Sequence, residues 1–149
     1  MDKKIVFICW VSWSGKWTVI NALLNTDKFK YFPSYSTRTI RPWEINWERY
    51  IFVSEEEFKK SIENNEFLEY AEYCENLYWT KKDITNINEW EKIFIKELEL
   101  AGLSKIIESH QIDNQFISIF LSVPEEIMKE RIKKRWAPIS EEELEKRIE

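Results

Sequence analysis

Glycine and cysteine are the residues that this sequence lacks most clearly. Its 149 residues include 2 glycines and 2 cysteines, Cys9 and Cys74. Average usage of about 7% would give roughly 10 glycines in a chain of this length. Two cysteines argue against a disulfide framework, so a reducing cytoplasm is the expected compartment.

Long apolar runs and an excess of positive charge are also missing. No apolar run approaches the roughly 18 residues of a membrane span. The short run near the N-terminus lacks the length and the cleavage site of a signal peptide. The net charge of −5 argues against a broad nucleic-acid-binding surface. A nucleotide pocket is compatible with it, because a few local cations can act inside an acidic protein.

Tryptophan is abundant where glycine is scarce. The 8 tryptophans and 2 glycines together match the number of glycines expected. Trp43, Trp47, Trp90 and Trp136 stand in polar turn or helix-end contexts, where glycine supplies a positive φ. One explanation is a tryptophan-rich surface that binds partners. The other is that these codons are UGA, one base from the glycine codon GGA, and stand for glycine; UGG codons would contradict it.

Strands that alternate with helices predict an α/β fold with a parallel sheet, and the length fits one domain. Strands are expected at 3–9, 49–53, 67–73, 92–98 and 115–122. Helices are expected at about 16–24, 54–64, 83–89, 103–109 and 124–134, with another after Ser140. Ser54 with Glu57 and Ser140 with Glu143 form capping boxes, and Pro124 is expected at a first helical position. Residues 33–48 are turn-rich.

A candidate phosphate loop follows the first expected strand. It runs Trp10-Val11-Ser12-Trp13-Ser14-Gly15-Lys16-Trp17-Thr18. Glycine at 10, 13 and 17 would complete the pattern of nucleoside monophosphate kinases. Backbone N–H groups in such a loop approach phosphate oxygens closely, and a Cβ blocks that approach. The alternative is a plain helix start with a solvent-exposed lysine.

Residues 34–50 carry polar side chains at a fixed spacing: Ser34, Thr37, Arg38, Arg41, Glu44 and Tyr50. The spacing resembles the guanylate kinase signature, Ser-x-x-Thr-Arg-x-x-Arg-x-Gly-Glu-x-x-Gly-x-x-Tyr, with Trp43 and Trp47 at family glycines. Segments 65–71 and 76–80 resemble two further family blocks, with Asn65 and Trp79 at glycine positions. The resemblance extends over essentially the whole chain.

The resemblance implies a GMP site. Two guanidinium groups would hold the GMP phosphate, helped by two tyrosine hydroxyls. Glu69 would accept from guanine N1–H and N2–H₂, and Ser34 and Thr80 would bond the base, Thr80 at O6. The implied GMP-binding set is Ser34, Arg38, Arg41, Tyr50, Glu69, Tyr78, Thr80 and Glu99. Taken singly, the arginines could be solvated and Glu69 could pair with a lysine.

The resemblance also implies an ATP and Mg²⁺ site. All of residues 10–18 would bind ATP, with Lys16 between the β- and γ-phosphates. Thr18 would help to hold Mg²⁺, and Glu97 would face it through water. Glu97 and Glu99 alternate onto one face of a strand end. Both stand where the family has aspartate, and Ala101 replaces a family glutamine. A charged strand terminus is the alternative.

Arginines near the C-terminus resemble those of the family lid: Arg131, Arg135 and Arg147. Lid arginines neutralise charge during transfer. The implied catalytic set is Lys16, Arg38, Arg135 and Arg147. The alternative is a basic helix face balanced by nearby glutamates.

The sequence thus predicts a P-loop-type guanylate kinase-like domain over 1–149, with its core at 1–33 and 81–123. A GMP-binding region is expected at 34–80 and a lid at 124–147, while a family C-terminal strand and helix are expected beyond the chain. The implied reaction moves the γ-phosphoryl group of ATP to GMP or dGMP, in cytoplasmic purine nucleotide metabolism. The expected protein is a monomer or homodimer with no nucleic-acid or membrane partner.

Two other functions are open at this point: a non-catalytic guanylate-kinase-like interaction module, and a kinase for a different nucleotide. Tryptophan in the phosphate loop predicts a further consequence. We expect the chain with its tryptophans not to bind ATP and to be inactive. Its indoles should be splayed outward, or its phosphate loop distorted, and Trp79 should crowd the GMP side near Thr80.

Overall fold

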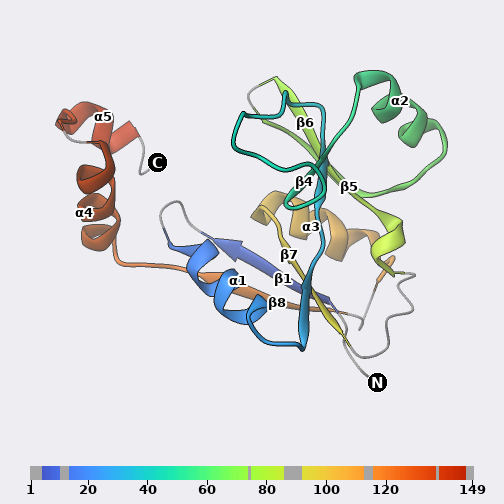
Figure 1. Cartoon of the computed structure of the whole chain (residues 1–149), viewed down its shortest axis with the longest axis horizontal. Coiled ribbons are helices and arrows are strands. Elements are labelled where there is room, and N and C mark those ends of the chain that lie inside the picture. The colour runs from blue at the N-terminus through green and yellow to red at the C-terminus, as the bar shows by residue number, and fades with distance from the viewer. Residues whose placement is uncertain are drawn as a thin grey trace.

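The computed structural model describes residues 5–10, 14–73, 75–85, 92–112, 116–136 and 138–146. Within them the chain forms a parallel sheet flanked by helices and a second, mixed sheet (Figure 1). The elements, in chain order, are β1 (Ile5–Trp10), α1 (Lys16–Leu24), β2 (Phe29–Tyr31), β3 (Ser34–Ser36), β4 (Tyr50–Phe52), α2 (Glu55–Glu63), β5 (Phe67–Tyr73), β6 (Asn76–Lys81), η1 (Lys82–Thr85), β7 (Ile93–Glu97), α3 (Leu100–Ser109), β8 (Phe116–Leu121), α4 (Glu125–Trp136) and α5 (Glu141–Lys146).

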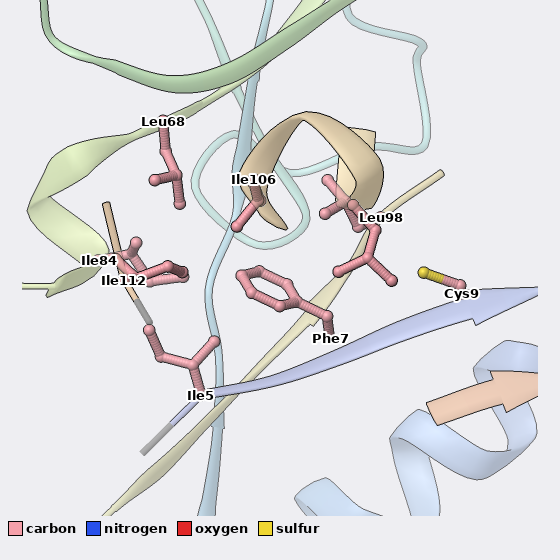
Figure 2. Close-up of a cluster of buried hydrophobic side chains, with 9 residues drawn as sticks. Ile5, Phe7, Cys9, Leu68, Ile84, Leu98, Ile106 and Ile112 are labelled. Atoms are coloured by element: carbon pink, nitrogen blue, oxygen red, sulfur yellow. The ribbon is translucent and has the colours of Figure 1, made fainter. Parts of the chain in front are cut away.

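The parallel sheet has the strand order β2-β7-β1-β8, with β1 near its middle. Residues 5–9 of β1 are all buried, because helices cover both faces of the sheet. Side chains alternate along the strand, so Val6 and Ile8 pack against Ile20 of α1. Ile5, Phe7 and Cys9 lie on the other face of the strand and pack on the side of α3, in the cluster that includes Ile106 (Figure 2). This buried strand carries the candidate phosphate loop at its carboxyl end.

The second sheet has the order β4-β3-β6-β5. Strands β3 and β4 are parallel, whereas β6 is antiparallel to both β3 and β5. Helix α2 covers it through Phe58, which contacts Phe67 and Trp79 with ring centroids 5.2 and 4.9 Å apart. The predicted capping box at the start of α2 is confirmed, since Ser54 and Glu57 bond reciprocally.

Helices α4 and α5 form a hairpin with a small core of its own, made by Met128, Ile132 and Leu144. The backbone N–H of Glu143 donates to the Ser140 hydroxyl at 3.2 Å, which is one of the two bonds of the predicted capping box. In Figure 1 this hairpin stands away from the parallel sheet, joined to β8 by an extended segment. No helix among the described residues has the length and apolar character to cross a membrane.

Several predicted boundaries were wrong. Strands β2, β3 and β6 were not predicted: β3 lies in the stretch expected to be turn-rich, and β2 has only three residues and is defined by its pairing with β7. The predicted helix at 83–89 is a short 3₁₀ turn over its described part, with 86–89 outside the described residues. Helix α3 begins at Leu100, three residues earlier than predicted. Helix α4 begins after Pro124, whose carbonyl accepts from the N–H of Met128.

Candidate functional site

A cavity of about 530 Å³ is lined by the carboxyl ends of β1 and β7 together with all four strands of the second sheet. Strand ends of a parallel sheet are where α/β folds place ligands. Eleven of the predicted site residues line it: Trp10, Lys16, Trp17, Ser34, Arg38, Arg41, Tyr50, Glu69, Tyr78, Glu97 and Glu99. Residues far apart in sequence therefore meet at one place.

The remaining predicted site residues lie elsewhere or outside the description. Ser14, Gly15, Thr18 and Thr80 do not line the cavity, although Thr80 bonds to a residue that does. Val11, Ser12, Trp13 and Arg147 lie outside the described residues, and the structure describes only the backbone of Arg135. The predicted roles of these residues stay predictions.

Arg38 is held rigidly at the cavity wall by Glu44. Its two terminal nitrogens donate to the two carboxylate oxygens of Glu44 at 2.8 and 2.7 Å, a bidentate pair. The backbone N–H of Arg41 donates to the same carboxylate at 2.8 Å. These bonds, foremost the one from Arg38, lower the pKa of Glu44 to about 2. The loop after β3 thus holds the Arg38 guanidinium and the Arg41 backbone in place.

Two tyrosines complete this side of the cavity. The rings of Tyr50 and Tyr78 meet edge to face, with centroids 5.9 Å apart. The Arg38 guanidinium lies 5.3 Å from the Tyr50 ring centre. Burial raises the pKa of the Tyr50 hydroxyl, so Tyr50 stays a neutral donor at physiological pH. Both arginines and both hydroxyls suit an oxyanion such as a phosphate.

Glu69 lies at another part of the cavity and is buried. Its Oε1 accepts a 2.6 Å hydrogen bond from the Thr80 hydroxyl, and burial raises its pKa. A Cβ on Gly102 would come within 3.1 Å of Oε2 of Glu69, so glycine at the start of α3 leaves room for this carboxylate. The single hydroxyl hydrogen of Thr80 is thereby engaged by Glu69.

Lys96 is a fully buried cation beside this acidic group. Its Nζ donates to Oγ of Ser34 at 2.7 Å, linking β7 to β3. Burial lowers its pKa to about 8, and the charges of Glu69 and Glu97 partly oppose that shift. Sequence analysis did not single out Lys96, because an isolated lysine within an apolar strand carries no motif.

The phosphate loop enters α1 through Gly15, whose φ of 81° lies in the left-handed region that favours glycine. A Cβ at Gly15 would lie 3.4 Å from a guanidinium nitrogen of Arg131, so helix α4 reaches this loop. Lys16 forms an ion pair with Glu97 at 2.7 Å, and its ammonium lies 3.2 Å from the ring centre of Trp10.

The indoles of Trp10 and Trp17 are not splayed outward, which corrects one alternative for the loop. Both line the cavity, and the Arg49 guanidinium lies 3.7 Å from the Trp17 ring centre. These large apolar rings gain contact area and cation–π attraction by turning inward. Whether the loop is distorted at 11–13 falls outside the described residues.

Trp79 lines the cavity, but its indole does not crowd Thr80 as expected. Side chains alternate along β6, so its indole lies on the opposite face from Thr80, 1% exposed and packed against aromatic rings. Its indole nitrogen is buried without a hydrogen-bond partner among the described residues. Trp47 is strained in another way, with a φ of 74°.

Glu44 and Arg49 line the cavity but were not predicted as site residues. Glu44 stands at a fixed position of the signature, so the motif itself could have indicated a role for it. Arg49 carries no such signal, since the signature leaves its position open.

Comparisons with known proteins agree with one family. A family model described as guanylate kinase matches residues 2–149. A guanylate kinase of a Nostoc species is 35% identical over 152 aligned positions, covering 100% of this chain and 74% of that protein. One from Caldanaerobacter subterraneus is also 35% identical, covering 97% and 69%. The crystal structure of guanylate kinase from Anaplasma phagocytophilum matches with a TM-score of 0.65 and 26% identity, covering 87% of this chain and 65% of that one.

Proposed function

This chain belongs to the guanylate kinase family, and on that premise we propose that its cavity transfers the γ-phosphoryl group of ATP to GMP. One observation carries the proposal. A single cavity brings the phosphate-loop Lys16 together with Arg38 and Arg41 of the signature and with the buried carboxylate of Glu69. Lys16 would bind the phosphates of ATP, the phosphoryl donor. Arg38 and Arg41 would hold the phosphate of GMP, the phosphoryl acceptor, and Glu69 would recognise its guanine base.

The acceptor phosphate would lie against the arginines and tyrosines. Arg38 keeps nitrogen donors in a geometry that Glu44 fixes in advance, so little side-chain entropy is lost on binding. Arg41, Tyr50 and Tyr78 add donors from the same wall. Transfer needs no covalent intermediate, because positioning and charge neutralisation supply most of the catalysis of phosphoryl transfer.

The donor phosphates would compete with Glu97 for Lys16. The Lys16 ammonium is paired with Glu97 at 2.7 Å. Polyphosphate carries more negative charge than one carboxylate, so Lys16 would turn from Glu97 to the β- and γ-phosphates. Glu97 would then be released to bond water or cation in the same cavity.

The residues present fit a water-mediated Mg²⁺. No group of three metal-ligating side chains gathers among the described residues. Mg²⁺ bound to nucleotides nevertheless takes most of its ligands from phosphates and water. Glu97, and Glu99 at the same strand end, offer hard carboxylate oxygens at the cavity, and Thr18 stays the predicted direct ligand. The ion would neutralise charge on the transferring group.

Guanine recognition would centre on Glu69. As a carboxylate it presents acceptors to the N1–H and N2–H₂ donors of guanine, an edge that adenine lacks. Residues 34–80 would form the acceptor region and 124–147 the lid, which the approach of Arg131 to Gly15 supports. We place the reaction in the cytoplasm, with ATP and GMP, or dGMP, as substrates.

The second candidate is a family member that binds protein partners without catalysis. Loss of the phosphate-loop lysine, or of the residues that bind the GMP phosphate, would favour this non-catalytic role. Lys16, Arg38, Arg41, Tyr50 and Tyr78 are all present and all line one cavity, which favours the enzyme.

Label transfer separates the two candidates. The chain with glycine at its eight tryptophan positions is incubated with Mg²⁺, GMP and ATP labelled at the γ-phosphate. The enzyme transfers the label into GDP, whereas Lys16→Ala abolishes the transfer. GMP binding without any labelled GDP would favour the non-catalytic module.

A further inference from the structure

Lys96 is a buried charge that the proposed reaction does not use. Its side chain is 0% exposed in β7, where it follows three apolar residues and precedes Glu97. Taking an ammonium out of water is costly, so such groups are rare unless something holds them. Here one hydrogen bond does so, from Nζ to the Ser34 hydroxyl oxygen at 2.7 Å. Glu69 and Glu97 add favourable charge.

The chemistry of the pair fixes the direction of that hydrogen bond. An ammonium has three hydrogens and no lone pair, so the Ser34 oxygen must accept. A serine hydroxyl has only one hydrogen, and Lys96 cannot take it. That hydrogen is therefore available to a third group. Ser34 lines the cavity, whereas Lys96 does not.

We propose that Lys96 determines base specificity by making Ser34 a hydrogen-bond donor toward the base of the bound nucleotide. Lys96 is a positioning residue, since it acts on the base only through Ser34. The inference rests on the proposed function, because it explains how the proposed acceptor site distinguishes GMP from AMP.

The contact between Thr80 and Glu69 explains why Ser34, rather than Thr80, is the hydroxyl left to donate toward the base. The Thr80 hydroxyl spends its one hydrogen on Oε1 of Glu69 at 2.6 Å, and a carboxylate only accepts. The cavity thus offers an acceptor at Glu69 and a donor at Ser34. Guanine carries an O6 acceptor where adenine carries an N6–H₂ donor. A hydroxyl free to rotate could satisfy either base, but one already accepting from Lys96 favours the oxygen.

The test measures the dissociation constants of GMP and AMP by calorimetry at pH 7, using the full chain with glycine at its eight tryptophan positions. The variants are Lys96→Met, Ser34→Ala and the double variant. Lys105→Met is the matched control, because Lys105 also acts electrostatically on Glu69 but donates to the Tyr70 carbonyl. Methionine matches the lysine side chain up to its terminal nitrogen and removes its hydrogen-bond donors.

Lys96→Met should weaken GMP binding about tenfold and lower the GMP-to-AMP preference by a similar factor, as expected for one misdirected polar contact. In the Ser34→Ala background it should have little further effect, because both substitutions remove the same contact. Lys105→Met should leave the preference unchanged.

Unchanged preference in Lys96→Met, or effects of the two substitutions that add, would overturn the inference while leaving the proposed function intact. A chain with glycine at its eight tryptophan positions, and no further substitution, that binds GMP no better than AMP would overturn both. Thermal melts check folding. If Lys96→Met does not fold, the Ser34→Ala variant is the test. An unchanged GMP-to-AMP preference in Ser34→Ala would show that the Ser34 hydroxyl does not contribute to specificity, and it would overturn the inference.

Discussion

At the scale of single residues, the cavity is organised by charges that hold one another in place. Glu44 fixes Arg38, Glu97 holds Lys16, and Lys96 engages Ser34. Each pair includes one residue with a proposed contact to nucleotide and a partner that orients or restrains it. Because such groups are ordered before a ligand arrives, changing either member of a pair should alter binding.

Removing the Arg38 side chain should weaken GMP binding at least tenfold. One charge-assisted hydrogen bond contributes roughly 1.5–3 kcal/mol. Calorimetric titration of Arg38→Ala with GMP measures the loss. Lys81→Ala is the control, because Lys81 pairs with Glu66 at 2.7 Å but does not line the cavity. An Arg38→Ala variant with unchanged GMP affinity would remove this residue from the phosphate site.

Glu44 should make stability depend on pH under acidic conditions. Its pKa falls from 4.5 to about 2 on folding, chiefly through the bond from Arg38. A depressed folded pKa stabilises the protein above the ordinary pKa, and that contribution is lost as pH falls toward the folded value. The difference in unfolding free energy between the unsubstituted chain and Glu44→Gln should therefore shrink from pH 5 to about pH 2.

Denaturant titrations at several pH values measure that difference. Glu63→Gln, at an exposed glutamate of α2, controls for the loss of one acidic group. A difference for Glu44→Gln that stays constant with pH would show that the Arg38–Glu44 pair does not depress the carboxyl pKa in solution.

At the scale of elements, the helices and caps that depend on local sequence could be predicted, whereas a strand that is defined only by its pairing could not. Helix α1 occupies the predicted 16–24, and Ser54 caps α2 as its spacing with Glu57 indicated. Strand β2 escaped prediction because three residues carry no periodicity, and only pairing with β7 defines it. The residues of the signature predicted most of the cavity wall. Lys96 could not be predicted, since its contact with Ser34 joins two sheets.

The loop between β3 and β4 offers a direct test of the glycine hypothesis. Trp47 has a φ of 74°, whereas Trp43 in the same loop has no positive φ, and their side chains are 66% and 76% exposed. A non-glycine residue in the left-handed region costs about 1–2 kcal/mol. Trp47→Gly should therefore raise the free energy of unfolding by about 1 kcal/mol.

Chemical denaturation compares Trp47→Gly with Trp43→Gly. Trp43→Gly loses a similarly exposed indole without relieving strain, so it should be neutral or slightly destabilising. Equal effects of the two substitutions, or destabilisation by Trp47→Gly, would contradict a backbone that requires glycine at 47.

At the scale of the whole molecule, the tryptophans of the phosphate loop are expected to prevent the nucleotide binding for which the surrounding residues are suited. Trp10 and Trp17 line the cavity beside Lys16, and the Trp10 ring lies against its ammonium. We predict that the chain with these tryptophans binds ATP too weakly for calorimetric detection. Replacing Trp10, Trp13 and Trp17 by glycine should restore binding, while Trp43→Gly should not. Micromolar ATP affinity of the unsubstituted chain would require another role for these indoles.

A coupled assay of ADP release tests the central claim, that the cavity joins a phosphoryl donor site to a guanine-specific acceptor site. The chain with glycine at its eight tryptophan positions is assayed with ATP, Mg²⁺ and GMP, AMP or UMP in turn. The account predicts ADP release with GMP that exceeds the rates with AMP and UMP at least a hundredfold, since a site built on buried polar groups rejects an unmatched base strongly. Equal rates with the three acceptors would contradict it.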